Sequence, residues 1–97
     1  MNNALFSWDS ANIYHIAEHD VTPDEAEEAL LGDPMDIAFE AELQAGRRWA
    51  FLGNTRQGRP LLIVIALRGR RLRVVTAYDP PAQGKLLLLA RKADSHE

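Results

Sequence analysis

The sequence predicts an α+β domain in which two N-terminal helices and one C-terminal helix pack against a four-stranded antiparallel sheet. Residues 9–32 contain two helix-start signals in succession, residues 35–78 contain four apolar segments joined by short polar turns, and residues 79–92 open with a proline pair and continue with leucines. A chain of 97 residues with 46% hydrophobic side chains can form one core. We therefore expect a single domain over residues 1–92 and a disordered tail over residues 93–97.

Two capping signals define the N-terminal helices. Asp9 or Ser10 can accept hydrogen bonds from the free N–H groups of a first helix that runs to Ala17 or Glu18. A capping box with a proline at the first helical position starts the second helix, and its residues are Thr22, Pro23 and Glu25. Gly32 ends this helix because glycine is favoured just after the last helical turn.

Four segments are predicted strands that follow one another through short turns. Residues 35–43 alternate apolar and polar side chains, and residues 47–55 and 71–78 alternate in a similar manner, which is typical of half-buried strands. Residues 60–67 are apolar on both faces and are therefore predicted to form the central strand. Short loops between successive strands imply an antiparallel meander.

The two ends of the chain leave alternatives open. Residues 5–8 (LFSW) form either a short edge strand or a turn before the first helix. Asp79 can cap the last helix, with two prolines in its first turn. The four leucines at 86–89 make an apolar stripe that is too wide for a helix packed on one side only. This helix therefore lies in a groove of the sheet or meets a partner, and a homo-oligomer through the C-terminal helix is one expectation.

Charge is divided unevenly along the chain. Residues 1–46 contain eleven acidic residues and no Lys or Arg, whereas residues 47–78 contain eight arginines and no acid, within a net charge of −3. The basic segment either contacts an anionic partner, since guanidinium matches phosphate geometry, or packs beside the acidic half so that the two charges screen each other. The eight arginines are Arg47, Arg48, Arg56, Arg59, Arg68, Arg70, Arg71 and Arg73.

Composition argues against cysteine-based sites, a signal peptide and a membrane helix. The absence of cysteine rules out disulfides, thiolate metal sites and cysteine nucleophiles, and it suits a cytoplasmic protein. The N-terminal residues lack the basic and apolar regions of a signal peptide. The longest apolar run, residues 61–67, is far shorter than the ~20 residues that a membrane helix needs, so we expect no membrane partner.

In the order of its motifs, the chain resembles the BrnT family, which are small ribonuclease toxins of bacterial type II toxin–antitoxin systems with a fold related to RelE. The matching pieces are WDSANIYHIAEHDVTPDEAEEAL, DP at 33–34, RRWAFLGNTRQGRPLLIVIAL and RLRVVTAYD, and in that order they lie within residues 6–79. The resemblance implies an endoribonuclease that cleaves RNA without a metal or other cofactor. It also implies a small antitoxin of the ribbon-helix-helix type as protein partner.

Metal-independent RNA cleavage needs a base for the 2′-hydroxyl, an acid for the leaving oxygen and positive charge beside the phosphorane. Imidazole suits the first two roles and guanidinium suits the third. The resemblance places His19 at the family histidine, while Arg71 and Arg73, two apart on one strand, point the same way and could grip one phosphate. The expected catalytic residues are His19, Arg48, Arg71, Arg73 and Tyr78, and the expected RNA-binding residues are Arg47, Arg59 and Arg70.

Three positions depart from the family pattern. Asp20 replaces the usual glycine after the histidine, and Glu18 replaces a common basic residue before it. Tyr78 replaces an arginine, for which it could substitute as a hydrogen-bond donor or a stacking surface for a base. Carboxylates beside His19 would also repel phosphate. These departures favour an alternative function, a non-catalytic BrnT-like module that binds protein or RNA and has lost nuclease activity.

The histidine pair in HIAEHD has further interpretations. His15 and His19 stand four apart, which is a spacing used by zinc sites. Zinc needs three or four protein ligands, and only Glu18, Asp20 and His96 are further candidates, so we expect no metal site. His19 at a helix end can instead have a purely structural role, with its charge set against the helix dipole. His15 is expected to be an ordinary residue of the helix face.

Overall fold

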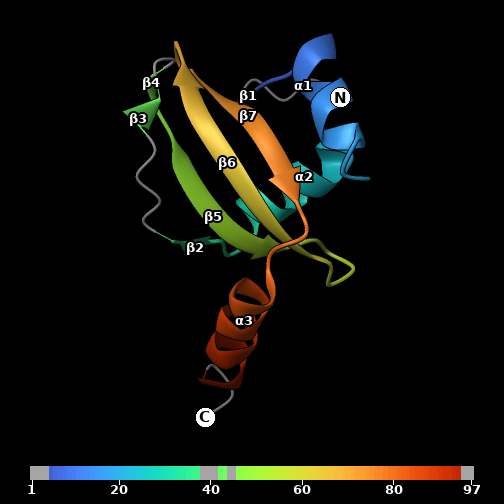
Figure 1. The fold of residues 1–97 in the computed structure, drawn as a ribbon, viewed down its shortest axis with the longest axis vertical. Coiled ribbons are helices and arrows are strands. Elements are labelled where there is room, and N and C mark those ends of the chain that lie inside the picture. Colours follow the sequence, from blue (N-terminus) through green and yellow to red (C-terminus); the bar gives the residue numbers. More distant parts are fainter. Residues whose placement is uncertain (1–4, 38–41, 44–45, 95–97) are drawn as a thin grey trace.

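The computed structural model describes residues 5–37, 42–43 and 46–94, which form three helices, a five-stranded sheet and a separate two-stranded pair (Figure 1). The helices are α1 (Ser10–Ala17), α2 (Pro23–Leu31) and α3 (Ala82–Asp94). The strands of the sheet are β1 (Phe6–Ser7), β2 (Met35–Asp36), β5 (Trp49–Asn54), β6 (Pro60–Arg68) and β7 (Arg71–Tyr78). The separate pair consists of β3 (Glu42–Leu43) and β4 (Gly46–Arg47).

The three long strands form the antiparallel meander that the sequence predicts. β6 lies between β5 and β7, which confirms residues 60–67 as the central strand. The register places Leu62 opposite Leu52 on one side and opposite Tyr78 on the other. A register shift after Val64 leaves one extra residue in β7, and such a bulge increases the local twist of the pair.

The sheet is five-stranded and mixed among the described residues, which corrects the predicted four-stranded antiparallel sheet. β1 joins β7 in parallel, with Phe6 opposite Leu72, and the N–H of Leu72 donates to the carbonyl of Leu5 (2.8 Å). The segment at residues 5–8 is therefore an edge strand rather than a turn. Local alternation contains no signal for this pairing because the two strands are far apart in the sequence.

The predicted strand over residues 35–43 is divided. Only its first part, β2, pairs with β5, and residues 42–43 belong to the separate β3–β4 pair. Residues 38–41 lie outside the described residues. β5 begins at Trp49, whereas Arg47 belongs to β4. Alternation of side chains indicates which face is buried but does not show which strand a segment pairs with, so the break was not predictable.

Both N-terminal helices begin where the capping signals predict. Asp9 is the N-cap of α1 and accepts hydrogen bonds from the N–H groups of Ala11 (3.0 Å) and Asn12 (3.1 Å). Thr22 and Glu25 form the predicted capping box of α2, and this helix has Gly32 as its C-cap. Each N-cap contributes about 1 kcal/mol, so local sequence is sufficient to define these helix starts.

α1 and α2 cover one face of the sheet (Figure 1). Buried aliphatic side chains fill the space between helices and sheet, and each large one contributes roughly 1.5–3 kcal/mol. They include Ile16, Val21, Leu61, Ile63, Ile65 and Val74. Gly53 of β5 allows α2 to approach closely, because a Cβ at this position would lie 2.5 Å from the carbonyl oxygen of Ala29. This packing holds α2, and the turn that precedes it, against the sheet.

α3 extends from one end of the sheet, where it contacts β5 and β6 (Figure 1). It begins at Ala82, so the prediction of Asp79 as its cap was wrong: the two prolines precede the helix, and the N–H of Lys85 donates to the carbonyl of Pro81 (3.2 Å). The helix continues to Asp94, and residues 95–97 of the predicted tail lie outside the described residues. Of its four leucines only Leu88 is buried, and the others are exposed by 65%, 46% and 62% at Leu86, Leu87 and Leu89. Within the described part of the chain, none of the helices has the length and apolar character needed to cross a membrane.

Candidate functional site

The turn between α1 and α2 carries the predicted catalytic residue His19. The N–H of His19 donates to the carbonyl of Ile16 (2.9 Å), and the N–H of Val21 returns to the same carbonyl (3.1 Å). Asp20 has a left-handed backbone with φ of +63°. This conformation favours glycine and is tolerated by aspartate. It therefore gives a backbone reason for the glycine that the family pattern has at this position.

His19 lies against Tyr78 at the end of β7. The two ring centroids are 5.7 Å apart and the ring planes are inclined by 56°. His19 is exposed and Tyr78 is half-buried, so the pair forms an accessible surface. The fold thus brings together two of the predicted catalytic residues, one from a turn and one from a strand that comes much later in the chain.

His15 adds a second imidazole to this surface. Its ring meets that of His19 edge-on, with centroids 5.6 Å apart, and its Nε2 lies 3.1 Å from the hydroxyl oxygen of Thr76. Its Nδ1 lies 3.7 Å from the Glu18 carboxylate. Sequence reasoning missed Thr76 and treated His15 as an ordinary helix residue. The spacing of the two histidines was the available signal, since residues four apart near one helix face are neighbours.

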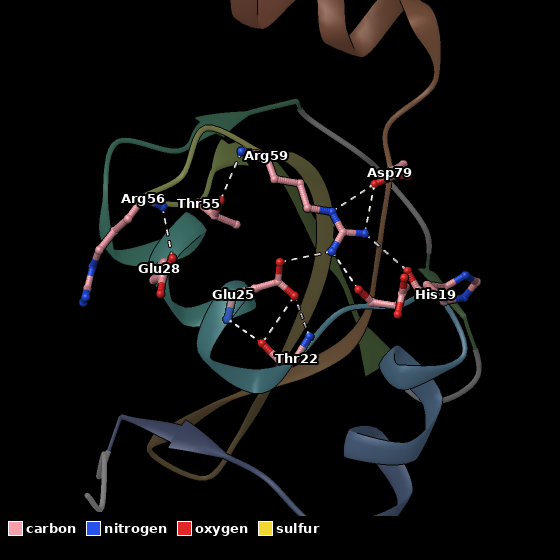
Figure 2. Close-up of polar contacts among 9 residues, drawn as sticks. His19, Thr22, Glu25, Glu28, Thr55, Arg56, Arg59 and Asp79 are labelled. Atoms are coloured by element: carbon pink, nitrogen blue, oxygen red, sulfur yellow. Dashed lines mark hydrogen bonds and ion pairs between the residues drawn. The ribbon is translucent and has the colours of Figure 1, made fainter.

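Arg59 ties the His19 turn to the sheet (Figure 2). Its Nη1 donates to the Asp20 carbonyl (2.7 Å) and to Glu25 (3.1 Å), while its Nε and Nη2 donate to Asp79 (3.3 and 3.1 Å). Nη2 also reaches the carbonyl of His19 (3.4 Å), whose imidazole points away from the guanidinium (Figure 2). This predicted RNA-binding arginine is thus bound within the chain, and its side chain is only 28% exposed.

The charges around Arg59 stabilise one another. The backbone N–H of Thr22 and the Arg59 guanidinium lower the pKa of Glu25 below its ordinary value of 4.5. Partial burial disfavours the charge of Arg59, but its hydrogen bonds to Glu25 and Asp79 outweigh that burial and raise its pKa. The cluster is therefore an ion-pair network that links α2, the β5–β6 turn and the end of β7.

Arg73 pairs with the N-cap of α1. Its Nη1 and Nη2 donate to the two carboxylate oxygens of Asp9 (2.8 and 3.2 Å). These bonds, together with the N–H of Asn12, hold the pKa of Asp9 below its ordinary value of 3.8. Asn12 is buried, and its Nδ2 donates to the carbonyls of Ser7 (3.0 Å) and Val74 (3.1 Å). Helix α1 is thereby fastened to both β1 and β7.

Arg70 and Arg71 lie at the opposite end of β7 from Tyr78. Both are exposed at the β6–β7 turn. Because β7 spans eight residues, a rise of about 3.3 Å per residue places Arg71 roughly 20 Å from Tyr78. The guanidinium of Arg73 is bound to Asp9, so the two arginines of the predicted phosphate grip have different surroundings.

Arg47 and Arg48 lie beside Trp49 at the start of β5. The Arg47 guanidinium carbon is 5.9 Å from the centroid of the Trp49 ring, which is within the range of a cation–π contact. Arg48 is partly buried, and its Nε has no hydrogen-bond partner among the described residues. The predicted site residues are therefore divided between two regions. The His19–Tyr78 surface lies at one end of β7, whereas the β6–β7 turn and the start of β5 lie toward the other end of the sheet.

The described side chains do not form a metal-binding cluster. Within residues 5–37, 42–43 and 46–94, no group of three or more His, Cys, Asp or Glu side chains is arranged to hold a metal ion. His96, a ligand candidate in the sequence, lies outside these ranges.

The chain matches a known protein family over most of its length. The family model described as "Ribonuclease toxin, BrnT, of type II toxin-antitoxin system" matches residues 8–82, which are 75 of the 97 residues. Neither the search of curated proteins nor the search of solved structures found a match. The matched region includes His15, His19, Arg59 and Tyr78, and it ends at the first residue of α3.

Proposed function

Because the chain belongs to the BrnT family of ribonuclease toxins of type II toxin–antitoxin systems, we propose that it is an endoribonuclease that cleaves RNA without a metal ion. One observation supports this most directly: the exposed His19 lies within the family match, with its ring 5.7 Å from that of Tyr78. Family membership implies an antitoxin protein as partner. We propose that this antitoxin is of the ribbon-helix-helix type, that its binding neutralises the activity, and that both proteins act in the cytoplasm.

His19 is the general base in this function. Imidazole can take the proton of a 2′-hydroxyl near neutral pH when it lies within hydrogen-bond reach. The hydroxyl of Tyr78 can donate a hydrogen bond to a phosphate oxygen, and its ring offers a stacking surface for a base. General acid–base catalysis contributes about 10²–10⁴-fold, so the loss of His19 is expected to lower the cleavage rate by a factor in that range.

The β6–β7 turn supplies phosphate contacts for the same RNA. Arg70 and Arg71 are exposed, and neither forms an ion pair with an acid in the part of the chain that the structure describes. A separation of roughly 20 Å from Tyr78 corresponds to an RNA segment several nucleotides long. Arg47, held over Trp49, extends the cationic surface along the sheet. Such contacts provide affinity and register rather than sequence preference.

A non-catalytic binding module is the second candidate, and a specific observation favours it. Two arginines close to the α1 region are already paired with carboxylates of the chain itself. Arg59 binds Glu25 and Asp79, and Arg73 binds Asp9. Cations that are already paired are less available to stabilise a phosphorane. A protein that kept the exposed arginines but lacked a free cation beside His19 would bind RNA or the antitoxin without cleaving RNA.

The test is cleavage of end-labelled RNA by the purified chain in the presence of EDTA. We expect the wild-type chain to produce discrete fragments, and His19→Gln and Tyr78→Phe to lower the rate. Tyr14→Phe is the matched control, because Tyr14 is on the neighbouring helix face, is 71% exposed and should leave the rate unchanged. Intact RNA with the wild-type chain, together with salt-dependent RNA binding, would select the binding module instead.

The exposed leucines of α3 support a contact with a second copy of the chain. Leu86 and Leu89 are accompanied on α3 by the cations Lys85 and Arg91. α2 offers a complementary surface, since it contains four acidic residues and no basic one, and its last residue, Leu31, is 57% exposed. We therefore propose that α3 of one copy packs on α2 of another.

A further inference from the structure

An imidazole–hydroxyl contact and an imidazole–phenol ring contact lie side by side between the α1 region and β7. The His15 ring is at hydrogen-bond distance from the hydroxyl of Thr76 (3.1 Å), and the His19 ring packs on Tyr78 (centroids 5.7 Å apart). Thr76 and Tyr78 are two apart on β7 and so share a face of the strand, separated by roughly 6–7 Å. The two imidazoles are themselves 5.6 Å apart between centroids.

We propose that His15 is a second catalytic histidine, the general acid that protonates the leaving 5′-oxygen while His19 acts as the base. This role depends on the ribonuclease activity proposed above. In the step, His19 takes the proton of the 2′-hydroxyl, and the 2′-oxygen forms a bond to phosphorus. The bond from phosphorus to the 5′-oxygen breaks, and its electron pair leaves with that oxygen, which receives a proton from His15. The products are a 2′,3′-cyclic phosphate and a free 5′-hydroxyl.

Two imidazoles fit this step better than one because the attacking and leaving oxygens lie on opposite sides of the phosphorus. A base and an acid must therefore reach the phosphate from two directions. The edge-on arrangement of the His15 and His19 rings provides two separated sets of ring nitrogens over one stretch of β7. A phosphate bound across the outer edges of the two rings could be reached by one nitrogen of each imidazole.

The His15 ring is oriented on both sides. The carboxylate of Glu18 lies 3.7 Å from its Nδ1, and the exposed hydroxyl of Thr76 lies 3.1 Å from its Nε2. Nε2 is the nitrogen that delivers the proton, and in that step the leaving oxygen takes the place of the Thr76 hydroxyl as its partner. A base or acid held by a further polar group is the usual arrangement of an acid–base catalyst. The titratable groups that face His15 are Glu18 at the end of its own helix, His19 in the following turn and, beyond His19, Tyr78 of β7. Glu18, a departure from the family pattern, thus gains a positioning role.

The experiment compares two RNA substrates that differ in one atom. One is an oligonucleotide that spans the cleavage site mapped with the wild-type chain. The other carries sulfur in place of the bridging 5′-oxygen at that site, so that its leaving group departs as a thiolate and needs no acid. We expect His15→Gln to slow cleavage of the oxygen substrate by about 100-fold or more and to cleave the sulfur substrate within a few-fold of wild type. His19→Gln should slow both.

A pH profile gives an independent measurement. A base must be unprotonated and an acid protonated, so His19→Gln should remove the low-pH limb of kcat/KM and His15→Gln the high-pH limb. The His15 side chain is 48% exposed, so its replacement leaves the core intact, and Tyr14→Phe is the folding control on the same helix.

The outcomes separate this role from the proposed function. If the wild-type chain cleaves neither substrate, the ribonuclease function is wrong and the role of His15 is wrong with it. If the wild-type chain is active and His15→Gln slows both substrates equally, or neither, His15 is not the general acid although the ribonuclease function stands.

Discussion

The Arg59 guanidinium donates a 2.7 Å hydrogen bond to the carbonyl of Asp20, a residue held in the left-handed region with φ of +63°. The turn at Asp20 directs this carbonyl toward the β5–β6 turn, and the same guanidinium binds Glu25 and Asp79. Asp79 follows Tyr78 directly, and Asp20 follows His19. One arginine therefore positions the turn that carries His19 relative to the strand that carries Tyr78.

Replacement of Arg59 by lysine is expected to lower the free energy of unfolding by about 1–3 kcal/mol. Lysine keeps the positive charge but cannot donate to the carbonyl and both carboxylates from one planar group. Urea denaturation followed by circular dichroism measures the change. Arg56→Lys in the same turn is the control and should change stability by less than about 0.5 kcal/mol, since Arg56 is exposed. Equal stability of the two variants would show that the Arg59 network is not structural.

Acid is expected to destabilise the fold through Glu25 and Asp9. The pKa values of both carboxyls lie below their ordinary values of 4.5 and 3.8 in the folded chain. The unfolded chain therefore binds more protons than the folded chain in this range, so stability is complete above about pH 5 and decreases as the pH falls through the lowered values. Urea denaturation between pH 3 and pH 7 should show this slope, and Glu25→Gln should reduce it. An unchanged slope in that variant would assign the acid sensitivity to other groups.

Asp20→Gly is expected to leave the free energy of unfolding unchanged or to raise it by up to about 1 kcal/mol. Glycine removes the strain of a positive φ, while its greater freedom in the unfolded chain offsets part of that gain. Asp20→Val should lose about 1–2 kcal/mol, because a β-branched residue is strained in the left-handed region. Thermal and urea denaturation measure both changes.

The same Asp20→Gly variant separates two explanations of the family departure. If the position is under backbone constraint only, RNA cleavage by this variant should stay within a few-fold of wild type. A rise of tenfold or more would instead show that the Asp20 carboxylate repels the RNA phosphate, as its place beside His19 first indicated.

Loss of Arg70 or Arg71 is expected to weaken RNA binding without altering stability. Each phosphate contact contributes about 0.7 to the slope of log K against log salt concentration for single strands, so Arg70→Gln and Arg71→Gln should each reduce the slope by about that amount. Fluorescence anisotropy with a labelled RNA over a salt series measures it. Arg56→Gln, at the other end of the sheet, is the control, and equal slopes in all three variants would exclude a local RNA contact at the β6–β7 turn.

Charge on the exposed face of α3 is expected to dissociate an oligomer of the chain. Leu86→Glu and Leu89→Glu place carboxylates where α3 would meet the acidic α2 of a second copy. Light scattering coupled to size exclusion should show a larger species for the wild-type chain and a monomer for these variants. Ala11→Glu, at an exposed position of α1, is the control for added charge away from α3, and a monomeric wild-type chain would contradict the contact.

The sequence by itself determined the local elements and the family. The caps at Asp9 and Thr22 and the apolar pattern of the central strand depend on residues two to four apart, and such neighbours interact in the same way whatever the rest of the chain does. The short turns between β5, β6 and β7 predicted their antiparallel order. The motifs that resemble the BrnT family can also be recognised from the amino-acid sequence alone, and the family match over residues 8–82 confirms the family.

Only the tertiary structure decided the partners of those residues. The uneven charge left two interpretations of the basic segment open. For Arg59 and Arg73 the structure shows that the guanidinium groups pair with carboxylates of the chain. Two of these carboxylates, Asp9 and Glu25, lie in the acidic half. The parallel β1–β7 edge and the contact between His15 and Thr76 likewise join segments far apart in the chain. Composition and periodicity describe what each segment requires, whereas the choice among many distant partners is made by the packing of the whole core, which no local pattern encodes.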